Sequence, residues 1–291
     1  MADEIGPDIV LPLVSPASHP GLAVDFPETS FFTTASPGVP RSLPAPSQVL
    51  ARHDVKSPYI VVFKELKLVV KYGDSDEVRL EEAIVMRTIR KAFPDGPVPV
   101  PEVFGWRVVD GKNFIYMSLM PGVCLGDIWN SLSRADKRSI CDSLGRVVSA
   151  LGRLRQDAST RLIGSICGGK VQEKAFNNEP HKLGPFSSVQ DFNKVLLTGP
   201  SDPFQFHFSA NYSIRFAHGD LNVFNILVSD THPIRITGIV DWEHSGWFPE
   251  YWEFCTMLHI NRGQEIVAKE YLERIFRRRF DVEYIVVRQH L

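Results

Sequence analysis

The sequence predicts an α+β protein with a small β-rich N-terminal lobe and a larger, mostly helical C-terminal lobe. Strand-like runs rich in valine, isoleucine and aromatic residues dominate between residues 59 and 119, with one helical segment among them. After Gly122, apolar residues recur mainly at helical spacing, and only short strand-like runs return. This order separates strands from helices along the chain, which is typical of two lobes with a cleft between them.

The predicted elements of the first lobe are, in order, strands at 59–63 and 66–72, a helix at about 77–93, and strands at 103–109 and 114–119. Asp76 is the expected N-cap of the helix, and Pro94 lies just beyond its end. Lys64-Glu65 predicts a tight turn that joins the first two strands as a hairpin. Asp110-Gly111 predicts a tight hairpin turn between the last two strands.

Helices dominate the prediction for the second lobe. They are expected at 125–132, 137–154, 189–197 and 264–280, with short strands at 226–228 and 234–240 and a polar, glycine-rich loop at 164–187.

Proline sets the first 50 residues apart from the rest. They hold nine of the 21 prolines and a single basic residue, Arg41. Proline disfavours helix interiors and central strands. We expect residues 1–50 to form an extended Pro-rich arm, either draped over the body or partly disordered.

The composition excludes two classes of partner. The chain has 291 residues, with 32 basic and 34 acidic side chains and a net charge of −2. This balance argues against nucleic-acid binding through bulk basicity. No apolar run reaches the roughly 18 residues of a membrane span. The first residues, Met-Ala-Asp-Glu, are acidic where a signal peptide is basic. We expect neither a nucleic-acid nor a membrane partner, and protein partners stay open.

The cysteines point to a reducing compartment. All four are scattered, without a C-x-x-C pair or a zinc-binding spacing: Cys124, Cys141, Cys167 and Cys255. We expect each to be a small buried apolar residue and the protein to be cytoplasmic.

One motif carries chemistry. Residues 218–225 follow the pattern H-G-D-L-x-x-x-N, and the second strand after them ends in Val240-Asp241. Phosphoryl transfer needs a carboxylate at the attacking hydroxyl, oxygen ligands for Mg²⁺ and a cation on the phosphates. Asp220 fits the first role, and Asn225 and Asp241 fit the second, because Mg²⁺ prefers hard oxygen ligands. An isolated H-G-D suits a turn with an Asx cap equally well; the later asparagine and aspartate favour catalysis. We expect His218 to support the loop, since Asp220 already fills the base role.

The partners of this motif can be sought upstream. Lys71 ends the strand Leu-Val-Val-Lys, as a phosphate-gripping lysine should, although an exposed edge-strand lysine is the alternative. Glu81 and Glu82 both stand on the next predicted helix. Apolar residues follow Glu82 by three, four, seven and eleven positions, so Glu82 lies within the apolar stripe. Because a buried acid is costly unless paired, Glu82 is the expected partner of Lys71, and Glu81 is expected to be solvated.

Residues from about 60 to 255 resemble the aminoglycoside phosphotransferase family, in its fungal kinase-like branch. The specific matching segments are 218–228 and the run from Val240 to Glu253, which reads VDWEHSGWFPEYWE. Weaker matches in the same order are Val-Val-Lys71-Tyr-Gly, Glu82-Ala83, Pro97–Glu102, Met117–Gly122 and Gly184-Pro-Phe-Ser-Ser.

The resemblance implies a protein-kinase-like bilobal fold with a nucleotide in the cleft, ATP and Mg²⁺ as cofactors, and GTP as the alternative nucleotide. Asp220 would receive the substrate hydroxyl, Asn225 and Asp241 would hold magnesium, and Lys71 would contact the nucleotide phosphates. The connector Ser118-Leu119-Met120 would meet the adenine with its backbone. Residues 51–120 would form the nucleotide-binding lobe, and residues 121–291 the catalytic and substrate lobe.

The spacing after Asp241 favours a small-molecule acceptor over a protein. Only seven residues separate Asp241 from Pro249, where a protein kinase places a long activation segment. We therefore predict a small-molecule kinase that transfers the γ-phosphate of ATP to a hydroxyl group.

The segment 241–253 predicts the acceptor class. It holds four acidic residues and no lysine or arginine, and aromatic residues interleave with them. Acids and aromatic faces together suit a cationic amine, so an amine-bearing alcohol is the hypothesis, with substrate contacts from Glu243, Trp247, Glu250 and Tyr251. The alternative is that the aromatic residues pack the core and the other acids cap helices.

Two rival functions stay open. A family member could be repurposed for non-kinase metabolite chemistry, or the chain could be a non-catalytic binding protein that uses its Pro-rich arm as the contact. The intact set of candidate residues, Lys71, Glu82, Asp220, Asn225 and Asp241, speaks against both rivals.

Overall fold

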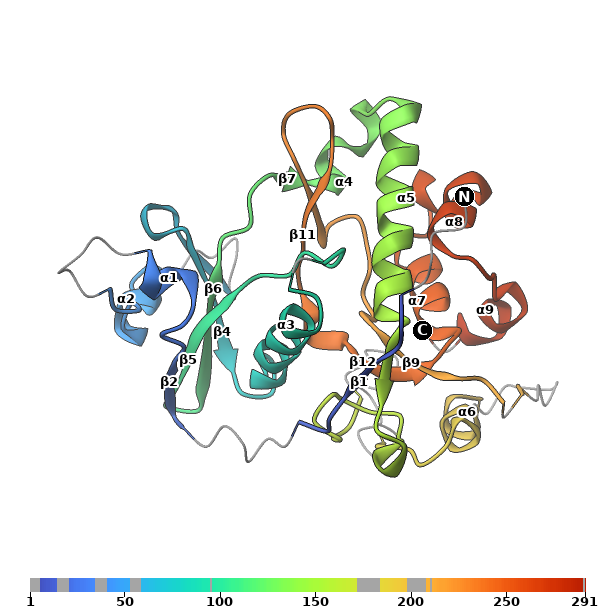
Figure 1. Ribbon diagram of the computed structural model, residues 1–291, viewed down its shortest axis with the longest axis horizontal. Coiled ribbons are helices and arrows are strands. Elements are labelled where there is room, and N and C mark those ends of the chain that lie inside the picture. The colour runs from blue at the N-terminus through green and yellow to red at the C-terminus, as the bar shows by residue number, and fades with distance from the viewer. Residues whose placement is uncertain are drawn as a thin grey trace. The chain divides into compact units, whose positions relative to one another are not determined.

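The computed structural model describes residues 6–14, 21–34, 41–52, 59–94, 96–171, 184–197, 208–209, 211–289 and 291 (Figure 1). Two compact units make up the chain: unit 1 comprises Met1–Ser15 and Gly122–Leu291, and unit 2 comprises Pro16–Pro121. A five-stranded sheet dominates unit 2, whereas unit 1 carries the long helix α5 (Arg134–Leu151) and short two- and three-stranded sheets. The predicted α+β class is confirmed.

The sheet of unit 2 has the strand order β2-β5-β6-β4-β3, and all its neighbours run antiparallel. Its strands are β2 (Ala23–Asp25), β3 (Ile60–Phe63), β4 (Leu68–Asp74), β5 (Val103–Val109) and β6 (Lys112–Ser118). Both predicted hairpins are confirmed. Asp110 and Gly111 have φ values of 50° and 75°, as a two-residue turn with left-handed backbone requires.

The helix of unit 2, α3 (Leu80–Ala92), begins three residues later than predicted, and its N-cap is Arg79 rather than Asp76. The amides of Glu77 and Val78 both donate to the carbonyl of Asp74 at 2.9 Å. Residues 75–78 therefore form a turn that ends β4 and inserts the buried side chain of Val78, so the helix starts only after it.

Part of the predicted arm belongs to the core of unit 2. The short helices α1 (Ser30–Thr33) and α2 (Pro46–Leu50) lie beside the sheet in Figure 1. They contribute Phe31 and Val49 to a hydrophobic cluster on one face of the sheet. Pro46 stands at the first position of α2, where its missing N–H is harmless.

Another part of the arm belongs to unit 1, where β1 (Ile9–Leu11) pairs in parallel with β8 (Leu154–Gln156). The remaining arm residues 1–5, 15–20 and 35–40 lie outside the described residues, as do residues 172–183 of the predicted loop.

In unit 1, α5 packs against α8 (Lys269–Ile275), and the two lie side by side in Figure 1. A Cβ atom at Gly145 of α5 would lie 2.3 Å from the carbonyl oxygen of Arg274, so only glycine permits this close crossing. The serine preceding α5, Ser133, caps its start by accepting from the amide of Asp136 at 3.1 Å.

Short strands and helices complete unit 1. One sheet has the order β11-β10-β7 and another pairs β12 with β9. The strands are β7 (Val123–Cys124), β9 (Ile214–Ala217), β10 (Ile226–Val228), β11 (Ile236–Ile239) and β12 (Gly246–Pro249), and the other helices are α4 (Leu125–Ile128), α6 (Val189–Leu197), α7 (Trp252–Ile260) and α9 (Asp281–Val287).

The predicted helix 264–280 is wrong as a single element. A 3-10 turn at Glu265–Val267 precedes α8, and Phe276 then adopts extended backbone. Phe276 and Phe280 pack edge-on against Phe254 of α7. The chain leaves the helix to make these contacts. Among the described residues, no helix combines the length and apolar composition needed to cross a membrane.

Candidate active site

The H-G-D loop of unit 1 connects β9 to β10 and begins with a fully buried histidine. His218 Nδ1 accepts from the amide of Asp220 at 3.2 Å, and Nε2 lies 3.1 Å from the carbonyl oxygen of Val240. This pairing assigns the ring proton to Nε2 of a neutral imidazole. Burial lowers the pKa of His218 to about 4, against the opposing effect of Asp220. His218 thus supports the loop, as predicted.

Gly219 allows the loop to approach the turn Trp242–His244. Its φ is +82°, and a Cβ atom there would lie 2.6 Å from the carbonyl oxygen of His244. A side chain at this position would therefore be strained and would collide with backbone. The loop therefore needs glycine at position 219 for steric reasons.

Two amide side chains hold the carboxylate of Asp220 in one orientation. Asn222 Nδ2 donates to its Oδ1 at 3.0 Å, and Asn225 Nδ2 donates to its Oδ2 at 3.0 Å. Each carboxylate oxygen can accept more than one hydrogen bond. Asp220 is therefore oriented without losing its capacity to accept a further proton or hydrogen bond.

The hairpin of β10 and β11 brings Asn225 and Asp241 together. Ile226 pairs with Ile239, and the amide of Val240 donates to the carbonyl oxygen of Asn225 at 3.0 Å. Because Asn225 Nδ2 faces Asp220, its Oδ1 is the atom left for a cation. Asp241 has a φ of 65°, a backbone conformation that side chains rarely adopt and that is concentrated at functional sites.

A second acid, Glu253 at the start of α7, anchors this loop. Its Oε2 accepts from the amides of His218 at 2.5 Å and Gly219 at 3.5 Å, and its Oε1 has no hydrogen-bond partner among the described residues. Glu253 is 8% exposed, and burial raises its pKa to about 7, against the lowering effect of the two amides.

Sequence reasoning counted Glu253 only as one of four acids and missed this role. An available signal was its position among the apolar residues of α7, the same signal that singled out Glu82. Asn261 was missed as well. It clamps the loop from the end of α7, where Oδ1 accepts from the amide of Val223 and Nδ2 donates to the carbonyl of Leu221, both at 3.1 Å.

Replacing Glu253 with glutamine is expected to change how stability depends on pH. Between pH 4.5 and 7 the folded state holds a proton on Glu253 that the unfolded state lacks, so this group's contribution to the unfolding free energy falls as pH rises. The unfolding free energy of E253Q, relative to the parent, should therefore rise by about 3 kcal/mol across this window. Urea denaturation at pH 5 and pH 7.5 measures the difference.

The loop offers a matched variant of opposite sign. The folded-state pKa of His218 lies below its unfolded value, so its stabilising contribution grows between pH 4 and 6.5. His218→Gln, relative to the parent, should lose stability as pH rises through that window. If the unfolding free energy of E253Q relative to the parent were the same at pH 5 and pH 7.5, the prediction would be contradicted.

The predicted substrate contacts need correction. Trp247 and Tyr251 are 2% and 0% exposed, so neither ring offers a face to a ligand. Trp247 packs edge-on against Phe216 of β9, and the Tyr251 hydroxyl donates to Asn193 Oδ1 at 2.5 Å. These two aromatic residues belong to the core of unit 1, which was the alternative interpretation.

The two acidic residues among the predicted substrate contacts each lie close to a basic side chain of unit 1. Glu250 lies 3.3 Å from Arg278, and Glu243 lies 3.2 Å from His244 Nε2. A cavity of about 180 Å³ does open beside Asp220, lined by Gly219, Asp220, His244, Thr256, His259, Ile260 and Leu291. Among the described residues of unit 1, this cavity is a better candidate for the acceptor-binding site than the four predicted contact residues of segment 241–253.

The predicted Lys71–Glu82 pair is present in unit 2. Lys71 Nζ lies 2.8 Å from Glu82 Oε2, and the two side chains are 10% and 2% exposed. Lys71 lies on β4, whose alternate residues Val70 and Tyr72 point into the hydrophobic cluster, so Lys71 faces the opposite side of the sheet. Glu81 pairs with Arg79 and its side chain is only 20% exposed, so it is less solvated than predicted.

The connector Ser118–Met120 begins at the last residue of β6. Two of its three amides are engaged: Ser118 donates to the carbonyl of Glu102 and Leu119 to the carbonyl of Lys67, each at 2.9 Å. Within the described part of the chain, the amide of Met120 donates to no backbone carbonyl. It is the amide left for a ligand.

Comparison with solved structures identifies the fold as kinase-like. The chain is similar to an aminoglycoside-3′-phosphotransferase of type VIII, with 14% identity and a TM-score of 0.51 over 77% of this chain and 83% of that one. It is also similar to a microcompartment-associated aminopropanol kinase, with 16% identity and a TM-score of 0.50 over 80% of each chain.

The family follows from the sequence. The profile of the phosphotransferase enzyme family, abbreviated APH, matches residues 46–285, and the chain belongs to this family. None of the curated proteins gives a significant match.

Proposed function

We propose that this protein is an ATP- and Mg²⁺-dependent phosphotransferase that phosphorylates a hydroxyl group of a small molecule. The observation that carries the proposal is the Asp220 carboxylate of a phosphotransferase-family member, held by Asn222 and Asn225. The backbone of Asn225 in turn bonds Val240, next to Asp241 with its positive φ. A carboxylate at the attacking hydroxyl and nearby oxygen ligands are the parts that phosphoryl transfer needs.

The step is a direct, in-line displacement. The acceptor oxygen forms a bond to the γ-phosphorus of ATP, the bond from that phosphorus to the β,γ-bridging oxygen breaks, and ADP leaves. The acceptor hydroxyl gives its proton to Asp220. Because the carboxylate is already oriented by two hydrogen bonds, positioning supplies much of the catalysis.

Asn225 and Asp241 would hold the magnesium ion. Their chemistry fits, since one amide oxygen and one carboxylate are hard donors and Mg²⁺ keeps several waters. When bound, Mg²⁺ neutralises charge on the phosphates. The hydrogen bond from Asn225 Nδ2 to Asp220 orients the amide oxygen that the ion would use.

Unit 2 supplies the proposed nucleotide contacts. Lys71, oriented by Glu82, would bind the phosphates, and the connector Ser118–Met120 would bind the adenine, with the amide of Met120 as a donor. ATP is the proposed nucleotide, and the experiment below includes GTP. We retain the cytoplasmic location expected from the scattered cysteines, because ATP is available there.

The acceptor would occupy the cavity beside Asp220. The seven residues between Asp241 and Pro249 form a 3-10 turn and most of β12, and this short connection supports a small acceptor. The names of two structural neighbours, an aminoglycoside phosphotransferase and an aminopropanol kinase, support amino alcohols as the first class to test.

A thermal-shift series with ATP and GTP, each with and without Mg²⁺, tests the nucleotide part. A ligand that binds the native state at about 100 times its Kd stabilises it by about 2.7 kcal/mol, so a clear rise in Tm is expected with MgATP. ADP release in the presence of amino alcohols and matched neutral alcohols then tests transfer. No shift with any nucleotide, or no acceptor-dependent ADP release, would favour the rival functions.

A further inference from the structure

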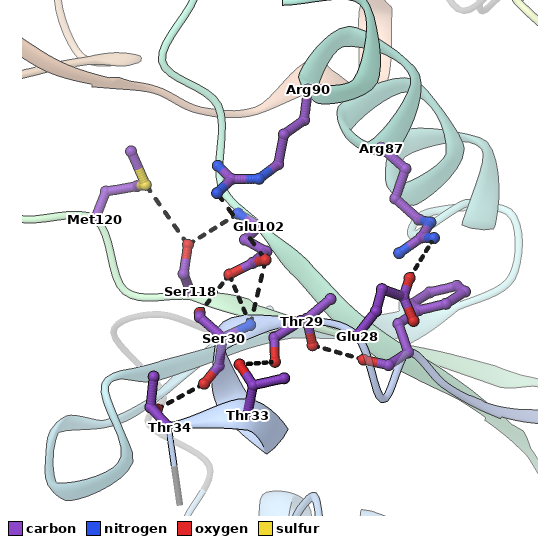
Figure 2. Close-up of polar contacts among 11 residues, drawn as sticks. Glu28, Thr29, Ser30, Thr33, Thr34, Arg87, Arg90, Glu102, Ser118 and Met120 are labelled. Atoms are coloured by element: carbon purple, nitrogen blue, oxygen red, sulfur yellow. Dashed lines mark hydrogen bonds and ion pairs between the residues drawn. The ribbon is translucent and has the colours of Figure 1, made fainter. Parts of the chain in front are cut away.

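A segment of the N-terminal arm contacts the proposed adenine connector through one glutamate, and all the residues involved belong to unit 2 (Figure 2). We call the set Ser30, Glu102 and Ser118 the connector latch. Its three members come from α1, from the residue before β5 and from the end of β6.

The arm side of the latch is firmly placed. Phe31 is buried in the hydrophobic cluster of the sheet, and the hydroxyl of Thr29 donates to the carbonyl of Phe26 at 2.7 Å. These contacts aim Ser30 at Glu102: its amide lies 3.3 Å from both carboxylate oxygens, and its hydroxyl donates to Oε2. Two donors of one residue thus meet one carboxylate, as Figure 2 shows.

Glu102 binds the connector with its backbone. Its amide donates to Ser118 Oγ at 2.9 Å, and its carbonyl accepts from the Ser118 amide at 2.9 Å. The Ser118 hydroxyl in turn points at Met120 Sδ, 3.7 Å away. Glu102 therefore joins Ser30 through its side chain to Ser118 through its main chain.

The other partner of Glu102 is weaker. Arg90 lies 4.0 Å from the carboxylate and is 51% exposed, whereas the Glu102 side chain is 16% exposed. Half-exposed ion pairs at this distance contribute little, while hydrogen bonds to a carboxylate are among the stronger ones. Ser30 is thus the main restraint on the Glu102 side chain.

We propose that Ser30 is a positioning residue for nucleotide binding: through Glu102 it fixes Ser118 and so the amide of Met120. The inference rests on the proposed function, because it takes the connector as the adenine contact. It gives the Pro-rich arm a role in the affinity for the nucleotide, a role that the catalytic motif does not suggest.

Variants of Ser30 test the latch in graded steps. Ser30→Ala removes the hydroxyl, and Ser30→Pro removes the hydroxyl and the amide hydrogen. Proline is tolerated at the first helical position, where Ser30 stands, and the extended backbone of Thr29 suits a residue before proline. Ser30→Thr keeps both donors. Thr34→Ala is the control, because that hydroxyl donates to the Ser30 carbonyl and not to Glu102.

Two measurements are made on the full chain. Hydrogen exchange reports the protection of amides 117–120 without any ligand, and calorimetry reports the Kd for MgADP. We expect faster exchange in this segment and a Kd raised about threefold in S30A and about tenfold in S30P. S30T and T34A should have the connector exchange rate and the Kd for MgADP of the parent. The KM of S30A for the acceptor should also equal that of the parent. Glu102→Gln keeps the backbone hydrogen bonds with Ser118. Its connector exchange rate and its Kd for MgADP should lie between those of S30A and those of the parent.

The outcomes separate the inference from the proposed function. Unchanged connector exchange in S30P overturns the latch whatever the nucleotide does. Faster exchange with an unchanged Kd overturns the role in nucleotide binding and leaves the proposed function standing. A parent protein that binds neither MgADP nor MgATP overturns both.

Discussion

Replacing Asp220 with asparagine is expected to lower turnover by about 10²–10⁴-fold, the range that general acid–base catalysis supplies. Asparagine keeps the shape of the side chain and can still accept one of the two amide hydrogen bonds from Asn222 and Asn225. It cannot accept the proton of the acceptor hydroxyl. The loop should stay folded, because its other anchors, Gly219, Glu253 and Asn261, do not depend on the Asp220 charge.

The measurement is kcat with the best acceptor from the alcohol series, together with the Kd for MgADP by calorimetry. Asp230→Asn, an exposed acid in the same unit, is the control and should keep the turnover of the parent. Turnover of D220N within about threefold of the parent would remove Asp220 from the mechanism, since a catalytic base contributes at least about 10²-fold.

Breaking the Lys71–Glu82 pair should cost more stability than any other single change considered for unit 2. Both side chains are almost fully buried, so removing one breaks this ion pair and leaves the other charge in a poorly solvated place. Such losses amount to about 3–5 kcal/mol. Lys71→Met and Glu82→Gln should each lower the unfolding free energy by an amount in this range and abolish turnover.

The double variant K71M/E82Q sharpens the test. Because neither charge then remains, it should recover part of the loss of stability, but it should stay inactive since the phosphate-binding cation is gone. Urea denaturation gives the stability and ADP release gives the activity. Glu65→Gln is the matched control, as Glu65 pairs with Arg52 on the surface of the same unit, and its loss should change stability little. Additive effects of K71M and E82Q would contradict the coupling.

Local patterns predicted the main strands and the helix of unit 2 and several individual chemical groups. Alternation and turn residues predicted the hairpins of unit 2, and the helical stripe around Glu82 predicted which of two adjacent glutamates meets Lys71. These succeed because each depends on residues close together in the chain. The start of α3 was placed three residues early because the turn at Asp74 competes for the same segment.

Burial within unit 1 was harder to predict. The segment 241–253 shows aromatic residues among acids, a pattern that fits a cation-binding face and a hydrophobic core equally well. Contacts with Phe216 and Asn193, which lie about 30 and 60 positions earlier, decide that Trp247 and Tyr251 are core. The predicted C-terminal helix failed for a related reason, because Phe276 and Phe280 reach Phe254 from a chain that has left the helix.

The sequence by itself determined the α+β class, the order of β3, β4, α3, β5 and β6 in unit 2, and the residue types able to carry phosphoryl transfer. Only the tertiary structure decided which residues position these groups. Glu253 and Asn261 accept hydrogen bonds from the loop of Asp220, and Ser30 donates to Glu102 next to the connector. A sequence pattern states that a face is buried or that an acid needs a partner. Which distant residue supplies that partner depends on how the chain packs, since a hydrogen bond forms only where two groups meet at contact distance.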